Sequence, residues 1–258
     1  MDFSITTIQT DLHWENKEVN CDLFSKAIRQ ASEKSSIIIL PEMFTTGFSM
    51  NTKNMAEEMD GPSVKWMKEK AKNIQKHLVG SLIIKENYNY YNRLIVACPD
   101  GVIQHYDKKH LFSYANEHKN YSAGKQELIL TIKGVRVAFF ICYDLRFPVW
   151  CRNLKLKYDI AVYIANWPEK RKNHWITLLK ARAIENQSYV IGVNRIGQDG
   201  NGVHYSGDSA VYNYLGEKVS KTEANEDSVE NVSLDISSME EYRTKFSTHL
   251  DADDFIIS

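Results

Sequence analysis

Residues 135–148 read VRVAFFICYDLRFP, and this stretch decides the fold. It is mostly apolar up to Ile141 and becomes polar after Cys142. The composition predicts a strand over 135–141 that is buried on both faces, as in sheets covered by helices. Cys142 therefore follows a buried strand directly, at the edge of a sheet where α/β proteins bind their ligands.

Helical and extended patterns alternate on both sides of this strand. Apolar residues at three- and four-residue spacing predict helices over 17–34, 61–76 and 170–184, with a helix-like stretch near 147–155. Apolar or β-branched runs predict strands over 3–9, 36–40, 77–84, 91–97, 101–106, 128–132, 160–165, 189–193, 209–214 and 218–221. Pro-Asp-Gly at 99–101 predicts a hairpin turn. The alternation predicts a layered α/β architecture.

The chain shows no internal repeat and no linker-like segment, so we expect one domain over 1–258. Its core would span about 2–235. The segment 222–258 is an acidic, amphipathic tail. We expect this tail to pack either on its own domain or on a neighbouring subunit.

Composition narrows the kind of partner. Of 258 residues, 43% are hydrophobic and 25% charged, as in ordinary globular proteins. The 32 basic and 33 acidic residues give a net charge of −1, which argues against nucleic acid and anionic membrane as partners. No apolar run approaches the roughly 18 residues that span a bilayer, and no targeting pattern opens the chain. We therefore expect a cytoplasmic protein that recognises a small molecule.

The four cysteines, at positions 21, 98, 142 and 151, are too scattered for a disulfide framework. None belongs to a CxxC pair, which argues against structural zinc. A free cysteine is usually an inert buried residue, so a special role for Cys142 needs support from other segments.

Two other predicted strands also lead into a reactive side chain. Glu42 follows the apolar strand that ends at Leu40, and Lys108 follows the strand that ends at Tyr106. Taken singly, the carboxylate fits a turn, the lysine a solvated surface and the cysteine a core position. Because side chains at strand ends can gather at one edge of a sheet, an acid, an amine and a thiol together form a usable constellation.

The segments LPEMF at 40–44, YDKKHLF at 106–112 and ICYDLRFP at 141–148 together resemble the nitrilase superfamily of carbon–nitrogen hydrolases. They occur in the family's order, and the resemblance covers about nine tenths of the chain. The segments TTGF at 45–48, ANEH at 115–118 and ANWP at 165–168 are similar to the ω-amidase branch. The resemblance implies a four-layer α-β-β-α sandwich that needs no cofactor and no metal.

The same resemblance implies an activity and a set of roles. The enzyme would hydrolyse the terminal amide of a small α-keto acid amide, such as 2-oxoglutaramate or 2-oxosuccinamate, to the acid and ammonia through a thioester. Cys142 would be the nucleophile, Glu42 the general base and then acid, and Lys108 with the Tyr143 backbone N–H the oxyanion stabiliser. Glu117 would orient Lys108 or position the attacking water.

The scheme requires a proton to pass from the Cys142 thiol to the Glu42 carboxylate. The ordinary pKa values of glutamate and cysteine differ by roughly 4 units, so transfer from thiol to carboxylate in water is uphill by about 6 kcal/mol. Burial would raise the pKa of Glu42 and the charge of Lys108 would lower it, while Lys108 and backbone amides favour the Cys142 thiolate; the sequence leaves this balance open. Asp144 is expected to cap the backbone that follows the nucleophile.

A keto acid amide carries a carboxylate, so its pocket should offer a cation or convergent N–H groups. The candidates are Arg146, Arg182 and Lys109. The aromatic residues next to the motifs, expected to wall the pocket, are Phe44, Tyr143 and Trp167. Val149 stands where many relatives carry glutamate, and we expect this departure to alter the pairing of Arg146.

Three other interpretations stay open. Cys142 could pair with His110 in a Cys–His hydrolase, because histidine is the commoner partner of a thiol. Another amidase of the superfamily would act on an aliphatic amide or a carbamoyl substrate. A catalytically silent binding module with the same fold is the third. Since members of the family are commonly dimers or larger, we expect a homodimer or larger homo-oligomer.

Overall fold

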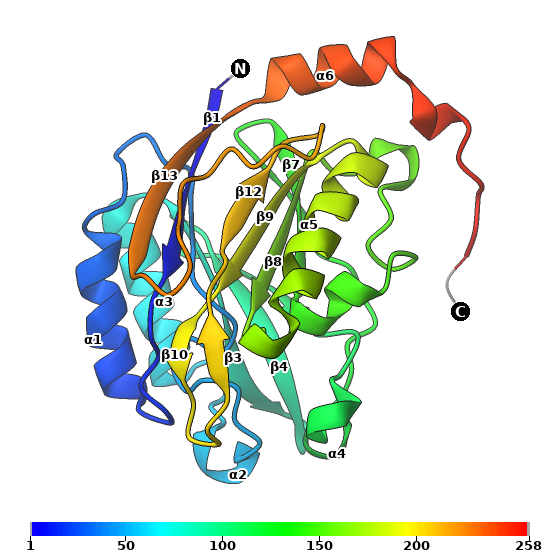
Figure 1. Ribbon diagram of the computed structural model, residues 1–258. Helices are drawn as coiled ribbons and strands as arrows, with labels where there is room; N and C mark the ends of the chain where they lie inside the picture. Colours follow the sequence, from blue (N-terminus) through cyan, green and yellow to red (C-terminus); the bar gives the residue numbers. More distant parts are fainter. Residues whose placement is uncertain (1, 257–258) are drawn as a thin grey trace.

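Two β-sheets lie at the centre of the molecule (Figure 1). The computed structural model describes residues 2–256, so residues 1, 257 and 258 of the predicted domain and tail lie outside the described residues. The first sheet contains, in spatial order, β13 (Ser228–Asp235), β1 (Asp2–Gln9), β2 (Ile37–Ile39), β3 (His77–Glu86), β4 (Asn89–Ala97) and β5 (Ile103–Asp107). The second contains β12 (Ala210–Tyr212), β9 (Tyr189–Asn194), β8 (Ile160–Ala165), β7 (Val135–Ile141) and β6 (Ile129–Ile132). A small hairpin pairs β10 (Ile196–Gln198) with β11 (His204–Ser206).

Parallel strands occupy the middle of each sheet, which matches their apolar sequences. β2 runs parallel to both β1 and β3, and β8 runs parallel to both β7 and β9. The outer strand pairs are antiparallel. Parallel strands need both faces covered, and their carboxyl ends point the same way. Each sheet thus brings several strand ends to one edge.

Helices cover the outer face of each sheet. The helices of the chain are α1 (Lys17–Ile28), α2 (Thr52–Met55), α3 (Pro62–Ile74), α4 (Glu117–Asn120), α5 (Lys172–Asn186) and α6 (Ile236–Lys245). α1 and α3 pack on the first sheet through Phe24 and Met67, whereas α5 packs on the second through Trp175 and Leu179. With the two sheets between these helices, the expected four-layer α-β-β-α sandwich is confirmed.

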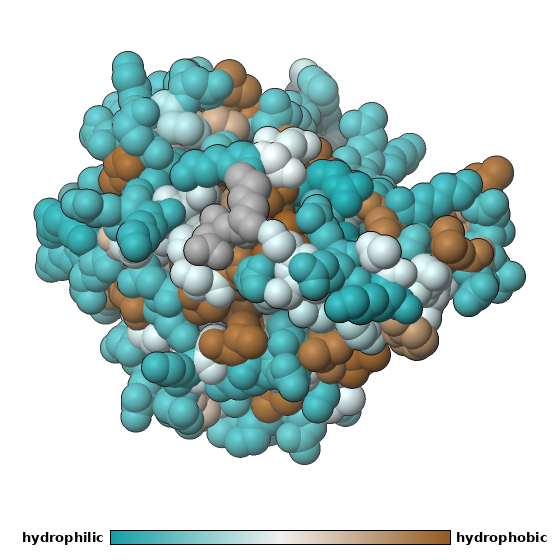
Figure 2. Space-filling view, turned by 90° about the horizontal axis from the view of Figure 1, so that it is seen from above, coloured by the Kyte–Doolittle hydropathy of each residue, from teal (hydrophilic) through white to brown (hydrophobic). Residues whose placement is uncertain are grey.

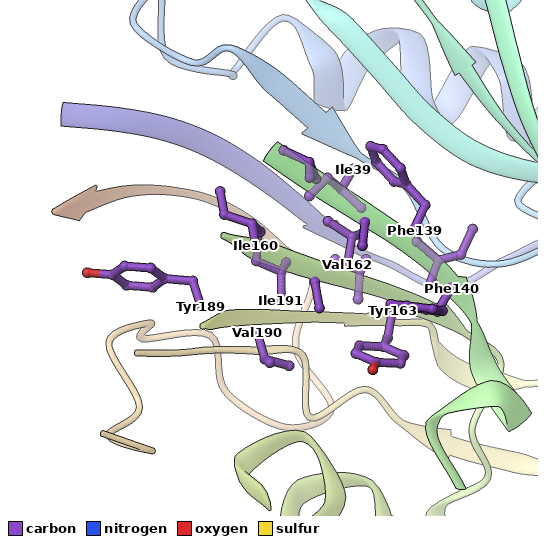
Figure 3. Close-up of a cluster of buried hydrophobic side chains, with 14 of the residues drawn as sticks. Ile39, Phe139, Phe140, Ile160, Val162, Tyr163, Tyr189, Val190 and Ile191 are labelled. Carbon is purple, nitrogen blue, oxygen red and sulfur yellow. The ribbon is translucent and has the colours of Figure 1, made fainter. Parts of the chain in front are cut away.

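Side chains alternate between the layers, as the two-residue period of a strand requires. In β2, Ile38 belongs to the core under α1 and α3, whereas Ile39 belongs to the core between the sheets. Figure 3 shows Ile39 beside Phe139, with Tyr163 on the other face of the second sheet. Tyr163 stacks there on Phe140 at a centroid distance of 5.0 Å.

Three elements differ from the sequence-based expectation. The stretch 147–155 forms turns and a short 3-10 helix over Leu154–Leu156 instead of a longer helix. The reason is local, because the Asn153 side chain bonds to both the N–H and the carbonyl of Tyr158 and ties the chain into a loop. The first helix ends at Ile28, short of position 34. The expected strand over 218–221 is only a single bridge between Lys218 and Tyr212.

The tail packs on its own domain over much of its length. β13 pairs antiparallel with β1, from Asp235 opposite Asp2 to Ser228 opposite Gln9. The Asp235 side chain then accepts a hydrogen bond from the Ser238 backbone and starts α6. In Figure 1, α6 crosses one end of the sandwich, opposite the end where α2 and α4 lie.

Candidate active site

The three reactive side chains come together where β2, β5 and β7 end. Glu42, Lys108 and Cys142 follow these strands within three residues, and all three are buried. Cys142 keeps the largest exposed fraction, 8%, and lies on the wall of a cavity. The β10–β11 hairpin forms part of the same wall, near the end of the molecule that carries α2 and α4 (Figure 1).

The Glu42 carboxylate is held by donors from three elements. Its Oε1 accepts from Lys108 Nζ at 2.9 Å and from Asn92 Nδ2 at 2.7 Å, and its Oε2 accepts from the Asn166 N–H at 2.7 Å. The Asn166 side chain also donates to the Glu42 carbonyl at 2.6 Å. A carboxylate fixed by several charge-assisted bonds has one orientation, which is what a proton acceptor at a reacting centre requires.

Lys108 lies between two carboxylates without exposure to solvent. Its Nζ is 2.9 Å from Glu42 and 3.0 Å from Glu117, and it lies 5.0 Å from the centre of the Phe48 ring. Burial pulls the pKa of Lys108 down, but the charges of Glu117 and Glu42 outweigh burial and raise the pKa above its ordinary value. The two carboxylates therefore favour the charged form of Lys108.

Glu117 is buried and shares the lysine with Glu42. Burial raises the pKa of Glu117, and the nearby positive charge of Lys108 only partly opposes this effect. Glu117 also accepts from the Phe112 N–H at 2.5 Å. With one cation between two carboxylates, the ionised cluster carries one uncompensated negative charge in a dry environment.

Cys142 has an unusual backbone for a non-glycine residue. Its φ is +45°, in the left-handed region, where β7 gives way to the 3-10 helix Cys142–Arg146. Burial raises the pKa of the Cys142 thiol well above its ordinary value, and the charge of Glu42 adds to this. Lys108 lowers the pKa, as expected, but burial outweighs it. The balance that the sequence leaves open is therefore on the side of the thiol, because burial and the charge of Glu42 outweigh Lys108.

Asn92 and Ser81 form a support for the carboxylates that the sequence reasoning missed. Asn92 Nδ2 reaches Glu42 at 2.7 Å and Glu117 at 3.2 Å. Ser81 Oγ donates to Asn92 Oδ1 at 2.9 Å and accepts from the Met43 N–H at 2.8 Å. The signal was present, because an asparagine within the apolar run 90–97 must find partners when it is buried.

Asp144 joins the segment of the nucleophile to the segment of the lysine. Its Oδ2 accepts from the Ile141 N–H at 3.0 Å and from Tyr106 Oη at 2.8 Å. Its Oδ1 accepts from the His110 N–H at 2.9 Å and lies 2.8 Å from His110 Nδ1. His110 also stacks on Phe147 at 3.8 Å. The imidazole is thus engaged by Asp144 and Phe147, which disfavours a Cys–His dyad.

The cavity next to Cys142 has a volume of about 700 Å³. Of the residues expected to contact substrate, Tyr143, Arg146 and Trp167 line it. Residues that sequence reasoning did not single out for this wall include Phe48, Phe112, Arg171 and Tyr205. Arg171 comes from the segment after the ANWP motif, where nothing in a single sequence distinguishes it from its basic neighbours.

Three expected pocket residues lie elsewhere. Phe44 does not line the cavity, because its ring packs in the helix-side core at 5.4 Å from Phe24 and 5.6 Å from Trp66. The reason is that residues 42–46 form a turn in which Met43 has a φ of +44°, so the strand alternation has ended and Glu42 and Phe44 point toward different surroundings. Arg182 donates to the Leu145 carbonyl and to Glu185, and Lys109 lies over the Trp150 ring.

Residues 2–256 contain no group of three or more His, Cys, Asp or Glu side chains placed to hold a metal ion. No helix among them has the length and apolar character to cross a membrane.

The fold and the sequence together define the class of the protein. The carbon–nitrogen hydrolase family model matches residues 4–244, so the chain belongs to the carbon–nitrogen hydrolase family. It is a hydrolase of carbon–nitrogen bonds other than peptide bonds.

Particular relatives narrow the comparison. The chain is 42% identical over 251 residues to the ω-amidase YafV of Escherichia coli strain K12, covering 97% of each chain. It is 35% identical to the 2-oxoglutaramate amidase of Bacillus subtilis, covering 77% of this chain and 78% of the relative. The crystal structure of XC1258 from Xanthomonas campestris, a CN-hydrolase superfamily protein with an arsenic adduct in its active site, superimposes with a TM-score of 0.97 at 39% identity over 100% of both chains.

Proposed function

We propose that this protein is a cysteine-dependent ω-amidase. It hydrolyses the terminal amide of a small α-keto acid amide, of the 2-oxoglutaramate or 2-oxosuccinamate type, to the acid and ammonia. The observation that carries the proposal is the buried cluster of Glu42, Lys108 and Cys142 at the wall of a cavity. The relatives named ω-amidase and 2-oxoglutaramate amidase support the choice of substrate.

Acylation uses Glu42 as the base. Because burial raises the pKa of the Cys142 thiol, its proton passes to Glu42 as the sulfur attacks the amide carbon. The carbon–sulfur bond forms, and the carbonyl oxygen becomes an oxyanion stabilised by Lys108 and the Tyr143 N–H. The carbon–nitrogen bond then breaks, and the amide nitrogen takes the proton from Glu42 and leaves as ammonia. Cys142 now carries the acyl group as a thioester.

Deacylation repeats the proton transfers with water. Glu42 accepts a proton from the attacking water, the carbon–sulfur bond breaks, and the proton returns to the Cys142 sulfur. Glu117 keeps Lys108 charged and oriented through the 3.0 Å contact, and Asn92 fixes both carboxylates. The sum is one amide and one water converted to one carboxylic acid and one ammonia.

Two wall residues contact the substrate in this proposal. Arg146 and Trp167 line the cavity beside Cys142, and the Arg146 guanidinium lies 4.8 Å from the centre of the Trp167 ring. Trp167 covers the apolar part of the acyl chain, and Arg146 offers positive charge.

The chain acts in this proposal as one catalytic domain, in the cytoplasm, as a homodimer or larger assembly. Exposed apolar side chains near α6 support the association of subunits. Figure 2 shows apolar side chains among hydrophilic ones on the face that carries α6, and Phe246 and Leu250 after α6 are 56% and 75% exposed. Elution as a monomer at micromolar concentration would contradict the assembly.

One assay tests the substrate. Ammonia release is measured from 2-oxoglutaramate, 2-oxosuccinamate, glutamine, asparagine, an aliphatic amide and a simple nitrile, with Cys142→Ala as the blank. We expect turnover of the two keto acid amides to exceed that of the others. Turnover confined to the nitrile or the aliphatic amide would refute the substrate, and no turnover of any compound would favour a silent binding module.

A further inference from the structure

Two arginines face the cavity without an acidic partner. Arg146 and Arg171 both belong to its wall. Within residues 2–256, neither guanidinium has a carboxylate within ion-pair distance, whereas buried Arg93, Arg195 and Arg243 each have one. Lys170 on the same wall is exposed, so Arg146 and Arg171 are its two partly buried arginine cations, and an anion bound between them would relieve their repulsion.

Aromatic rings hold both guanidinium groups in place of carboxylates. Arg146 lies over Trp167, and its Nη2 is 2.9 Å from His174 Nδ1. Arg171 lies 5.4 Å from the Phe112 ring centre and 5.7 Å from that of Tyr114. Ring faces contact the flat side of a guanidinium and leave N–H groups at its edge for another acceptor.

The acidic residues of the wall do not neutralise this pair. The Asp199 carboxylate accepts from the backbone N–H groups of Asn201 and Val203 and from the Tyr205 hydroxyl. Glu169 is exposed and forms no ion pair with either arginine. Val149, next to the Arg-Phe-Pro run, is 56% exposed and provides no carboxylate to Arg146.

Arg171 also acts on Arg146, with which it shares the cavity wall. Burial lowers the pKa of Arg146, and the charge of Arg171 lowers it further. A planar carboxylate accepts two parallel N–H bonds from a guanidinium, and a carboxylate is the free anionic group of the keto acid amides in the proposed function.

We propose that Arg146 and Arg171 form a carboxylate clamp that selects amides carrying an anionic group at the far end of the acyl chain. The inference rests on the proposed function and deepens it. Mono-amides of dicarboxylic acids bind with their free carboxylate at the clamp and their amide at Cys142. Neutral amides of the same length gain no such contact, so the clamp determines specificity and does not change the chemistry at the sulfur.

The first test compares substrates with and without the charge. We expect Arg171→Met and Arg146→Met each to lower kcat/KM for 2-oxoglutaramate by about 10- to 100-fold, the loss of one charged hydrogen-bonding group. Hydrolysis of pentanamide, a neutral amide of five carbons, should change by less than about threefold, by the same reasoning. Arg171→Lys should lie between wild type and Arg171→Met, because a lysine keeps the charge without the fork. Lys172→Met, next in the chain and outside the cavity wall, is the matched control.

A second readout does not depend on turnover. Iodoacetamide, which is neutral, alkylates Cys142, and 2-oxoglutarate is expected to protect it in the wild type. The concentration needed for half protection should rise about 10- to 100-fold in the two Met variants and stay constant in Lys172→Met. Alkylation without 2-oxoglutarate should proceed at the same rate in all of them, which shows that the variants are folded.

The outcomes separate the two proposals. Unchanged kcat/KM and unchanged protection in both Met variants would overturn the clamp while leaving the amidase proposal intact. Equal losses for 2-oxoglutaramate and pentanamide would also overturn it, since they indicate a structural role. If the wild type hydrolyses no keto acid amide but its arginine-dependent protection persists, the clamp stands and the proposed function fails.

Discussion

Two clusters of three charges, each around a buried central residue, have opposite compositions. At the candidate active site one lysine, Lys108, lies between the carboxylates of Glu42 and Glu117. Under α6, one carboxylate, Asp159, lies 2.7 Å from both Arg136 and Arg243. The first cluster holds an excess negative charge and the second an excess positive charge.

The pKa values of Asp159 and Glu117 are shifted in opposite directions because the two clusters differ in net charge. Burial would raise the pKa of Asp159, but hydrogen bonds from Arg136 and Arg243 outweigh it and lower the pKa below its ordinary value. At Glu117, burial outweighs Lys108, and the pKa is raised. A buried carboxylate whose negative charge is fully balanced by cations stabilises the fold, whereas one whose charge is only partly balanced takes up a proton more readily. The active-site cluster is therefore less stabilising than the Asp159 cluster, and its carboxylates are more basic.

The largest effect on turnover should come from removing the Glu42 carboxylate of the active-site cluster. We expect Glu42→Gln to lower turnover by roughly 10³-fold or more, because the amide cannot accept the thiol proton. The free energy of unfolding should change little, since the substitution removes a like-charge contact with Glu117. Turnover and urea unfolding measure the two expectations.

His110 provides the control for this prediction. His110→Ala should cost about tenfold or less, because its ring contacts Asp144 and Phe147. Near-normal turnover in folded Glu42→Gln, with activity lost in His110→Ala, would favour the Cys–His interpretation.

The second cluster should show the reverse pattern. Arg243→Gln removes one partner of a buried pair whose side chains are only 5% and 6% exposed. We expect the free energy of unfolding to fall by about 3 kcal/mol, while kcat per folded molecule stays unchanged.

Urea unfolding followed by circular dichroism measures the Arg243 effect. Lys245→Gln on the same helix is the control, because Lys245 is 78% exposed and its pair with Glu241 contributes little. If Arg243→Gln also lowered kcat per folded molecule, the two clusters would not be independent.

The smallest effect is on the pH dependence of stability, because Asp159 and Glu117 should change the free energy of unfolding in opposite directions as the pH rises. Asp159 has a lowered pKa, so its contribution to stability is present above about pH 3.8 and is lost as the pH falls through the folded-state value. Glu117 has a raised pKa, so the folded state holds its proton more tightly and stability falls as the pH rises above about 4.5. Each slope is at most about 1.4 kcal/mol per pH unit for one proton.

Unfolding free energies between pH 3 and 7 measure these slopes. Asp159→Asn should remove the loss at acid pH, and Glu117→Gln should remove the fall at higher pH. If the free energy of unfolding depended on pH in the same way in both variants, the expected opposite slopes would be contradicted.

The sequence predicts the layers because their signals are local. The buried strand 135–141 and the hairpin at 99–101 both depend on residues adjacent in the chain, and both are present. The convergence of Glu42, Lys108 and Cys142 also follows, because each comes directly after a strand.

Partners far apart in the chain could not be predicted in this way. Asn92 reaches Glu42 across 50 positions, and Arg243 reaches Asp159 across 84. Phe44 follows the expected motif yet packs toward α1 and α3, because only the packing of the layers decides which side a residue after β2 takes. The net direction of the Cys142 pKa likewise depends on how deeply the sulfur is buried.

The pairing of β1 with β13 has a consequence for biosynthesis. Phe3 lies opposite Leu234, so β1 waits during synthesis for a partner made more than two hundred residues later. Until then β1 is an edge strand, with unpaired N–H and carbonyl groups open to other chains. The register joins the two most distant strands of the chain, a contact of high loop-closure cost that forms late. During translation, the nascent chain is therefore most prone to aggregate just before residues 228–235 emerge.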